Sequence, residues 1–397
     1  MRVPEERVGM NRHLSNKYAI AGLGVTPVGK TGMSSDMLAA EAVRLAADDA
    51  GLSVDDLDGF ITHNAGMHGY GRATGDVPRR AGMRNAKMIW SMYAGGGTAM
   101  AQVMTAIGAL ETGMCSAVVC VLASDEGTRH DLRASIIRPA STAGAYGMFT
   151  PGAIHAMMFR RHMHDYGTTP EQLGMIAVTQ RAYANKRPDA IMHGRTMTID
   201  DYLDSPPVVE PLRRFDYCLV SDHGVAFIVT SAERARDLKT QPVHISGVGM
   251  SHQLKLSPKE QYSMLDITEA KEQAFSMAGI TMRDIDVAQL YDCWTVTVLY
   301  ELEGYGFCAR GEGGAYAADG MLGPDGPIPV NTQGGGLSWT HARGHTQISE
   351  AVRQLRGEAG GTQVKDAEVA LCAGHGGDTS YYDQTPCYQH LTVVLQK

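Results

Sequence analysis

The feature that most constrains the fold of this sequence is a long internal repeat. Residues 41–64 align without a gap with residues 269–292. Matched positions include Gly51 with Gly279, Asp56 with Asp284 and Asp58 with Asp286, and the flanks pair 18–24 with 243–249 and 116–122 with 367–372. A repeat of this extent is too large for a solenoid unit of about 20–50 residues. It predicts two similar α/β halves that face each other, with function where the halves differ.

Apolar runs and helical patterns alternate along both copies. In the first copy the expected strands are 19–25, 60–62 and 118–122, and the expected helices are 35–50 and 98–110. In the second copy the expected helices are 267–278, 294–304 and 344–357, and the expected strands are 287–290, 369–371 and 391–394. This alternation predicts an α/β fold with a mostly parallel sheet covered on both faces. Thr98–Leu110 and Gly344–Gly357 are expected to be adjacent central helices, related by a pseudo-twofold axis.

The predicted organisation is an N-terminal extension (1–17), a first half (18–240) and a second half (241–397). Residues 124–215 interrupt the first half with a segment rich in Met, His, Arg and Pro that has no counterpart in the second half. An insertion in one half of a duplicated fold often covers the active site. We therefore expect this loop domain to act as a lid or a binding loop.

Composition excludes several classes of function. A net charge of −8 argues against a nucleic-acid partner, since phosphate binding needs clustered Lys and Arg. No apolar run reaches the roughly 20 residues of a membrane span, and residues 1–17 have no apolar core typical of a signal peptide. The seven cysteines are scattered without a C-x-x-C pair, which favours reduced thiols and a cytoplasmic location over disulfides or a zinc site.

Three motifs, in this order along the chain, resemble the thiolase superfamily. They are Ser221–Gly224 (Ser-Asp-His-Gly), Leu290–Thr295 (Leu-Tyr-Asp-Cys-Trp-Thr) and Gly335–Gly344. At the third motif, the family usually has the sequence Gly-Gly-Leu, followed a few residues later by Gly-His-Pro-x-Gly. From about Tyr18 to the C-terminus, the sequence is similar to those of the sterol-carrier-protein-type thiolases and the related lipid-transfer proteins. The resemblance implies a thiolase fold of two βαβαβ halves.

The resemblance also shows that a thiolase residue is missing. Thiolases carry a nucleophilic cysteine in the turn before the buried helix of the first half, where the helix dipole lowers its pKa. Here the turn reads Ser91–Thr98, and Tyr93 falls on the cysteine slot. A tyrosine, with an ordinary pKa of about 10, cannot replace a thiolate as acyl acceptor. Cys115 and Cys120 follow only beyond the helix, so a cysteinyl acyl-enzyme is not expected.

Two polar residues at family motif positions are the strongest catalytic candidates. Tyr291 stands where the family has the histidine of His-Asp-Cys, at the end of a predicted strand, and can donate to an oxygen or relay a proton. His341 matches the histidine of the Gly-His-Pro segment and suits general acid–base work, or oxyanion stabilisation when protonated. The alternatives are a packed tyrosine and a histidine that caps the following helix. His345 offers no third metal ligand, so no metal site is predicted.

Other candidates are a thiol and several glycines. Cys372 begins a segment that resembles the Cys-x-Gly loop of thiolases, whose thiol transfers a proton; a buried structural thiol is the alternative. Glycine-rich turns allow backbone N–H groups to approach an oxyanion. The glycines concerned are Gly95, Gly96, Gly335 and Gly376. Tight helix packing explains the same glycines, and the two interpretations are compatible.

The missing cysteine favours one function over two others. Some members of this superfamily that lack the nucleophile cleave a β-hydroxyacyl-CoA by a retro-aldol reaction, as in steroid side-chain breakdown. We predict such an acyl-CoA lyase, acting on a steroid or aromatic side chain. The alternatives are a thiolase or acyltransferase acting on a β-ketoacyl-CoA, and a non-catalytic acyl-CoA or lipid-binding subunit.

The resemblance also implies partners. The coenzyme A thioester is expected as substrate, with no bound cofactor. The family's usual unit is a homodimer, and relatives without the nucleophile commonly act with a small partner that combines a zinc ribbon with an OB-fold. A heterotetramer with such a partner is therefore expected.

Overall fold

Two sets of strands with the same internal order meet at one strand pair. The computed structural model describes residues 12–63, 76–129, 142–148, 150–253, 260, 263–376 and 389–397. The first-half strands are β1 (Tyr18–Val25), β2 (Gly59–His63), β3 (Met88–Met92), β4 (Ala117–Asp125) and β7 (Asp222–Ser231). Those of the second half are β8 (Val243–His252), β9 (Val287–Gln289), β10 (Val369–Gly376) and β11 (Gln389–Gln396). Residues 1–11 of the predicted extension and 130–141 of the predicted insertion lie outside the described residues.

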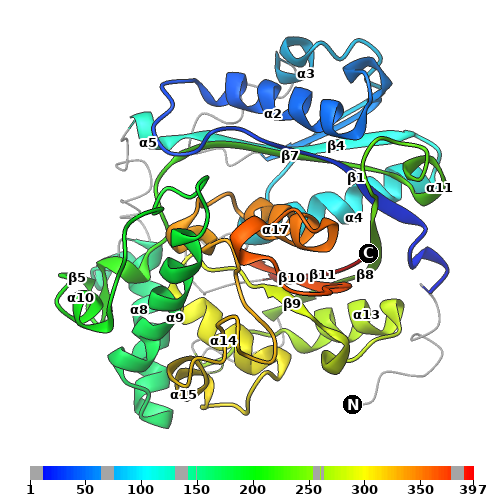
Figure 1. Ribbon diagram of the computed structural model, residues 1–397. Coiled ribbons are helices and arrows are strands. Elements are labelled where there is room, and N and C mark those ends of the chain that lie inside the picture. The colour runs from blue at the N-terminus through cyan, green and yellow to red at the C-terminus, as the bar shows by residue number, and fades with distance from the viewer. Residues whose placement is uncertain are drawn as a thin grey trace.

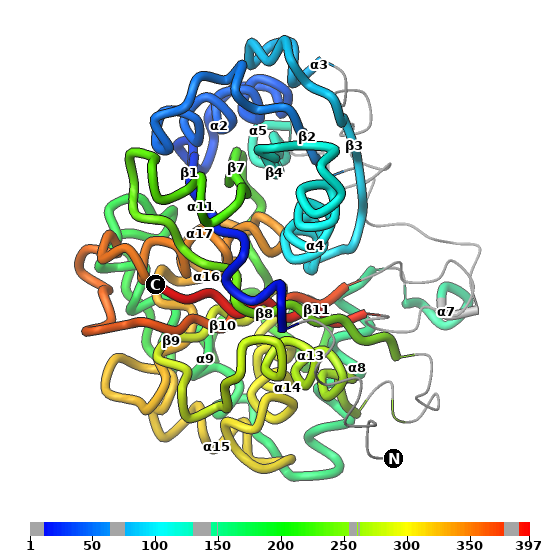
Figure 2. Tube along the Cα trace, turned by 90° about the vertical axis from the view of Figure 1, so that its right-hand side faces the viewer, coloured from blue at the N-terminus to red at the C-terminus, as the bar shows by residue number. Residues whose placement is uncertain are grey.

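The strand order repeats from one half to the other. The nine strands named above form one sheet, ordered β3-β2-β4-β7-β1-β8-β11-β10-β9. Outward from the antiparallel β1–β8 pair, the order β1-β7-β4-β2 of the first half recurs as β8-β11-β10-β9 in the second. The order is that expected for two halves related by a pseudo-twofold axis. β3 extends the first half and lies at the outer edge of that layer in Figure 2.

The sheet is mixed, so the prediction of a mostly parallel sheet was wrong. β2 pairs in parallel with β3 and β4, and β9 pairs in parallel with β10. β7 and β11, however, run antiparallel to both of their neighbours. An alternation of helices and apolar strands does not reveal the direction of a strand that returns into the middle of a sheet.

The matched glycines have the same structural roles in both copies. Helix α2 (Ser35–Ala50) ends at Gly51 and helix α13 (Thr268–Ala278) ends at Gly279, each in the left-handed conformation with φ 71°. Glycine adopts this conformation at little cost, which explains why it ends both helices. The strands β1 and β8 then pack directly on these helices through glycines matched in the repeat. A Cβ on Gly24 would stand 2.1 Å from Ala42 O, and one on Gly249 would stand 1.9 Å from Ala270 O.

Two central helices separate the two sheet layers. In Figure 1, α4 (Thr98–Glu111) and α17 (His345–Arg356) lie between the layers, with α2 and α3 (Asp76–Ala81) outside one layer and α13 and α14 (Thr295–Tyr305) outside the other. His345 Nε2 on α17 is 2.9 Å from Gln102 Oε1 on α4, which confirms the predicted adjacency. Apolar side chains of both helices share one core with strands of both halves, among them Val103, Ile107, Ile348, Val352, Val118 and Val393.

The chain between β4 and β7 is mainly helical and packs on the second half. Its elements are α5 (Glu126–Arg129), α7 (Thr142–Ala145), α8 (Pro151–Tyr166), α9 (Pro170–Asn185), α10 (Ile199–Leu203) and the hairpin β5 (Pro207–Val209) and β6 (Leu212–Arg213). On α8, His162 Nε2 is 2.8 Å from Glu303 Oε1, and Met158 O accepts from Tyr300 O–H at 3.0 Å. Both partners belong to α14, so this segment of the first half covers the second (Figure 1).

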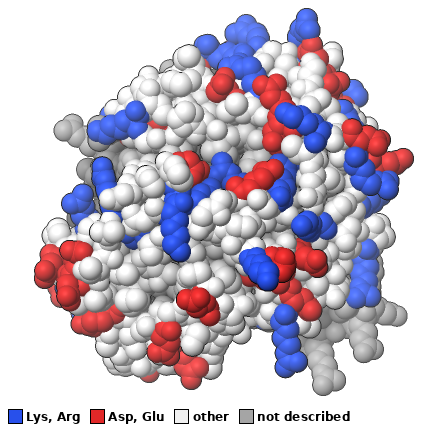
Figure 3. Space-filling view, viewed as in Figure 1, with Lys and Arg blue, Asp and Glu red and all other residues white. Residues whose placement is uncertain are grey.

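The remaining α-helices are short. They are α11 (Ala232–Ala235), α15 (Gly313–Ala318) and α16 (Gly335–Ser338). α15 lies within the Gly-, Pro- and Asp-rich stretch 308–332. None of the helices in the described part of the chain is long and apolar enough to cross a membrane. Lys and Arg are interspersed with Asp and Glu over the face in Figure 3, so no broad basic surface for a nucleic acid appears there.

Candidate active site

The two strongest candidates from the sequence, Tyr291 and His341, meet in the structure. Tyr291 lies two residues beyond the end of β9, and His341 lies in the short connection between α16 and α17. The Tyr291 hydroxyl is 2.7 Å from His341 Nε2. Tyr291 is only 4% exposed. A short hydrogen bond therefore joins two residues that are 50 positions apart in the sequence, one after β9 and the other between α16 and α17.

Burial keeps both members of this pair neutral. It raises the pKa of Tyr291 well above its ordinary value of about 10. It also lowers the pKa of His341 well below 6.5, and the positive charge of Arg343 adds to this effect. With both groups neutral, a general-base role for His341 requires the tautomer that carries the ring proton on Nδ1, in which the phenol donates to Nε2. Of the two roles predicted for His341, the neutral base fits this environment and the imidazolium does not.

Asp292, next to Tyr291, is held by the glycine turn that starts α16. Its carboxylate accepts from the N–H groups of Gly336 at 2.9 Å and Leu337 at 3.2 Å, and from Gln347 Nε2 at 3.2 Å. Burial raises the pKa of Asp292 to about 6, against the lowering effect of these hydrogen bonds. A Cβ on Gly335 would stand 2.0 Å from Asp292 Oδ2. The Gly335 turn thus fixes Asp292, and two of its amides already have a partner.

The first glycine turn forms the other wall of the site. Gly95–Gly97 is a single 3-10 turn that leads into α4. A Cβ on Gly96 would stand 2.1 Å from the Tyr291 ring, and one on Gly376 would stand 2.6 Å from Gly96 N. Close packing therefore requires glycine at these positions. The predicted role of Gly95, Gly96 and Gly376 as oxyanion donors stays a prediction.

Tyr93, at the slot of the missing cysteine, lies just before this turn. It is 39% exposed, and its ring centroid is 5.3 Å from that of His63 at the end of β2. His63 Nδ1 is in turn 3.1 Å from Thr98 Oγ1, at the first residue of α4. At the position predicted to correspond to the thiolase cysteine, the structure thus places a phenol beside an imidazole.

Cys372 is not brought to this pair. It lies within β10, opposite Gln289 and Val393, and is fully buried. Its Sγ is 3.8 Å from Gln347 O, and burial raises the pKa of the thiol. These contacts favour a structural thiol over a catalytic base. The physical reason is strand length: β10 continues to Gly376, so Cys372 lies in the strand and not in the loop.

The structure reveals three buried residues that sequence reasoning did not select. Cys293 Sγ is 3.7 Å from His375 Nε2, and His375 Nδ1 is 3.2 Å from Glu301 Oε1. The His375 ring lies edge-on to the Tyr291 ring, with centroids 4.9 Å apart. Cys293 follows Tyr291 by two residues and His375 follows Cys372 by three. Cys293 and His375 therefore lie within motifs that the sequence identified. Their closeness in the sequence to Tyr291 and Cys372 was the only indication that they belong to the site.

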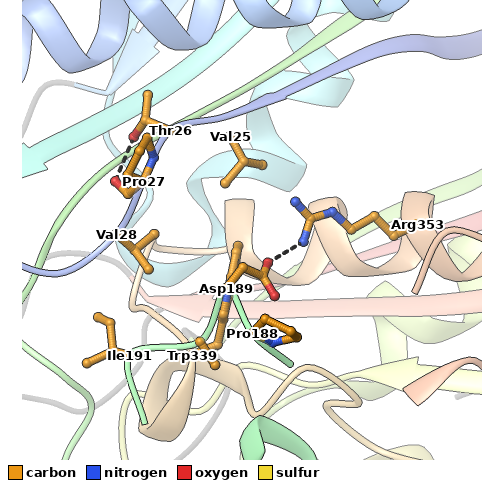
Figure 4. Close-up of a pocket in the computed structure, with 10 residues that line it drawn as sticks. Val25, Thr26, Pro27, Val28, Pro188, Asp189, Ile191, Trp339 and Arg353 are labelled. Atoms are coloured by element: carbon orange, nitrogen blue, oxygen red, sulfur yellow. Dashed lines mark hydrogen bonds and ion pairs between the residues drawn. The ribbon is translucent and has the colours of Figure 1, made fainter. Parts of the chain in front are cut away.

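A separate cavity of about 480 Å³ lies where β1, the chain after α9 and α17 meet. Figure 4 shows its lining, which is Val25–Val28, Pro188–Ile191, Trp339 and Arg353. Its charged groups pair with each other, with Arg353 Nη1 2.8 Å from Asp189 Oδ2. The lining contains none of the candidate catalytic residues, so this cavity stands apart from the Tyr291–His341 site.

Comparison with known proteins decides the family. The family described as "Thiolase C-terminal domain-like" matches residues 247–385. The chain is 37% identical to the "Steroid side-chain-cleaving aldolase" of Thermomonospora curvata, over 92% of this chain and 97% of that protein. The chain belongs to the thiolase-like acyl-CoA aldolases. This confirms the resemblance to the thiolase superfamily branch that lacks the nucleophilic cysteine.

Two further relatives agree with this family. The aldolase described here is 36% identical to the "17-hydroxy-3-oxo-4-pregnene-20-carboxyl-CoA lyase" of Mycobacterium tuberculosis, over 92% of this chain and 98% of that protein. The solved "Ltp2-ChsH2(DUF35) aldolase" superposes with a TM-score of 0.83 and 33% identity, covering 96% of this chain and 98% of the other. The thiolase fold and an acyl-CoA lyase, both predicted from the sequence, are therefore confirmed for this aldolase.

Proposed function

We propose that this aldolase cleaves a β-hydroxyacyl-CoA by a retro-aldol reaction in which Tyr291 and His341 move the proton. The observation that carries the proposal is the 2.7 Å hydrogen bond between Tyr291 and a neutral His341. It occurs in a chain whose cysteine slot holds Tyr93. An acid–base pair without a nucleophile suits cleavage without a covalent acyl-enzyme.

The reaction needs one proton to leave and one to arrive. The proton of the β-hydroxyl passes to the Tyr291–His341 pair, and the bond between the α- and β-carbons breaks. The electrons of that bond form the enolate of the thioester, while the β-carbon becomes a carbonyl. The pair then returns a proton to the α-carbon. Because proton loss and gain balance, one neutral imidazole linked to one phenol serves both steps.

The glycine turn before α4 is the proposed support for the enolate oxygen. Gly95 and Gly96 precede a 14-residue helix, whose first N–H groups carry partial positive charge. Gly96 lies against Tyr291, so these amides are beside the proton-transferring pair. Donors aimed at a developing oxyanion are typically among the largest contributions to catalysis.

The proposed substrate is a coenzyme A thioester with a steroid side chain, and an aromatic side chain is the alternative. Both curated relatives described above have steroid chemistry in their names, "Steroid side-chain-cleaving aldolase" and "17-hydroxy-3-oxo-4-pregnene-20-carboxyl-CoA lyase". No bound cofactor is needed for the steps above.

One observation supports an acyltransferase as a second candidate. Cys293 beside His375, with Glu301 on the other ring nitrogen, has the order of a nucleophile, a base and an orienting carboxylate. Cys293 is however 5% exposed and does not lie at the start of the central helix, where the dipole would activate it. Non-catalytic acyl-CoA binding is the third candidate, and turnover excludes it.

We also propose a homodimer that pairs with a small partner protein. The edge strand β3 exposes Ile89 (44%) and Trp90 (55%), an apolar edge of the kind that proteins usually cover. If β3 forms the dimer contact, Trp90→Lys should give a monomer by light scattering. The similar solved aldolase is named as a pair, "Ltp2-ChsH2(DUF35)", which supports a small zinc-ribbon and OB-fold partner here.

The experiment is a substrate panel. Purified protein, with and without its small partner, is incubated with β-hydroxyacyl-CoA and β-ketoacyl-CoA esters that carry steroid or aromatic groups. The proposal expects a carbonyl product and a shortened acyl-CoA in equal amounts from β-hydroxy esters. Consumption of β-keto esters that requires free coenzyme A would support the acyltransferase.

A further inference from the structure

Three buried side chains bring donor atoms together beside Tyr291. They are His155 on α8, Cys293 before α14 and His375 on β10, and one donor atom of each lies within 4.8 Å of the other two. Cys293 Sγ and His375 Nε2 are 3.7 Å apart. The three residues come from the insertion and from two segments of the second half. The fold therefore assembles this cluster from distant parts of the chain.

The hydrogen bonds of both histidines leave their Nε2 atoms as lone-pair donors. His155 Nδ1 is 2.8 Å from Pro151 O, and a carbonyl oxygen can only accept, so Nδ1 carries the proton. His155 Nε2 is buried and has no hydrogen-bond partner among the described residues. His375 Nδ1 is 3.2 Å from Glu301 Oε1, which orients its ring in the same sense. Metal-bound histidines typically have such an oxygen on the other nitrogen.

The carboxyl group beside His375 has an oxygen without a partner. Glu301 lies on α14 and is fully buried. Its Oε1 is 3.2 Å from His375 Nδ1, and its Oε2 has no hydrogen-bond partner among the described residues. Two imidazoles, one thiol and one carboxyl group therefore lie together in the interior beside Tyr291.

We propose that His155, Cys293 and His375 bind one zinc ion. Zinc takes sulfur at about 2.3 Å and nitrogen at about 2.0–2.1 Å, which places tetrahedral donors roughly 3.3–3.6 Å apart. The Cys293–His375 pair is already near this spacing, and the other pairs need to close by at most about 1.5 Å. The Cys293 thiol loses its proton on binding. Three protein ligands leave a fourth position for water or another ligand.

A second set of donors shares His375. Glu301, His375 and His390 also lie within 4.8 Å of one another. In that set, a metal would have to replace the Glu301–His375 hydrogen bond. It would also compete with the Tyr305 hydroxyl, which is already 2.8 Å from His390 Nε2. The first set keeps Glu301 as the hydrogen-bond acceptor of a ligating histidine and uses a thiolate, a strong ligand for zinc. This site differs from the His341–His345 pair that the sequence excluded.

The experiment measures metal directly and needs no substrate. The full chain is purified without chelators and without a histidine tag, and its zinc is measured by elemental mass spectrometry. The apoprotein is then titrated with Zn²⁺, and with Co²⁺ to detect the thiolate-to-cobalt charge-transfer band. We expect about one ion per chain, a charge-transfer band and a higher melting temperature with metal.

Matched variants decide which residues bind. Cys293→Ser should abolish the charge-transfer band, and His155→Phe, which keeps a ring against Trp294, should lose zinc. Glu301→Gln should weaken binding by roughly 10–100-fold, as expected for a group that only orients a ligand. Cys308→Ser and His390→Phe should retain the metal. Circular dichroism checks folding, and Cys293→Ala replaces any Cys293→Ser protein that does not fold.

Three results would overturn the site. One is a folded wild-type apoprotein that takes up no zinc. Another is a Cys293→Ser protein that keeps the charge-transfer band. The third is loss of metal from His390→Phe with retention in His155→Phe, which would move the site to the second set.

Discussion

Gly96 lies against the ring of Tyr291: a Cβ on Gly96 would stand 2.1 Å from both Cε1 and Cζ of that ring. The backbone of Gly96 is not left-handed, so the available space alone demands glycine here. The carbonyl of His375 would stand 2.6 Å from the same Cβ. The turn before the first central helix and the tyrosine of the second half are therefore fitted to each other across the interface between the halves.

Gly96→Ala should displace Tyr291 and impair the enzyme. The added methyl group cannot fit without moving the Tyr291 ring, and overpacking of this kind costs about 1–3 kcal/mol of stability. We expect a lower melting temperature together with a loss of turnover. The matched control is Gly108→Ala on α4, where nothing lies within 4 Å of the new Cβ. That variant should gain up to about 1 kcal/mol because alanine favours helix. Equal behaviour of the two variants would show that Gly96 does not position Tyr291.

Asp58→Asn should destabilise the protein in a pH-dependent way. Burial raises the pKa of Asp58, but hydrogen bonds from the Ala117 and Ser116 amides and from Lys87 lower it more, so the net shift is downward. A lowered pKa in the folded state stabilises above the unfolded value of about 3.9, and this contribution is lost as pH falls through the folded value.

The variant should therefore be less stable by about 1–3 kcal/mol at pH 7, with a gap that narrows below pH of about 4. Thermal or denaturant unfolding across this pH range measures it. Asp366→Asn is the control, because its side chain is 85% exposed. A gap for Asp58→Asn that stays constant down to pH of about 3 would mean that ionisation of Asp58 does not stabilise the fold.

Incubation with acyl-CoA esters should leave every cysteine unmodified. Tyr93 stands at the position predicted for the thiolase cysteine, and the Cys293 thiol is buried beside His375. Intact-mass measurement followed by peptide mapping, with iodoacetamide labelling to detect thiols, checks this. A stable acyl adduct on Cys293 would replace the lyase proposal with the acyltransferase.

The repeat allowed much of the fold to be predicted from the sequence. Gly51 and Gly279 end matched helices, and His345 meets Gln102 where two central helices were expected. Strand direction was missed because apolar runs have no polarity: β7 and β11 enter the sheet antiparallel to both neighbours.

The candidate site was only partly predictable. Tyr291 and His341 could be found because family motifs mark both positions. His375 could not be selected, because its partners Glu301 and Cys293 lie 74 and 82 residues away in the sequence and meet it only in the fold. Cys372 was chosen in its place because the motif suggested a loop where β10 continues.

In the proposed reaction, the Tyr291 hydroxyl moves a proton during carbon–carbon cleavage. Tyr291→Phe keeps the ring against Gly96 and removes only the oxygen that is 2.7 Å from His341 Nε2. Tyr183→Phe is the matched control, because its buried hydroxyl donates to Leu322 O at 3.2 Å, away from the site. The decisive measurement is kcat of both variants on the β-hydroxyacyl-CoA that the wild type cleaves. We expect kcat to fall about 10²–10⁴-fold for Tyr291→Phe and to stay near the wild-type value for Tyr183→Phe. Near wild-type turnover of a folded Tyr291→Phe protein would contradict it.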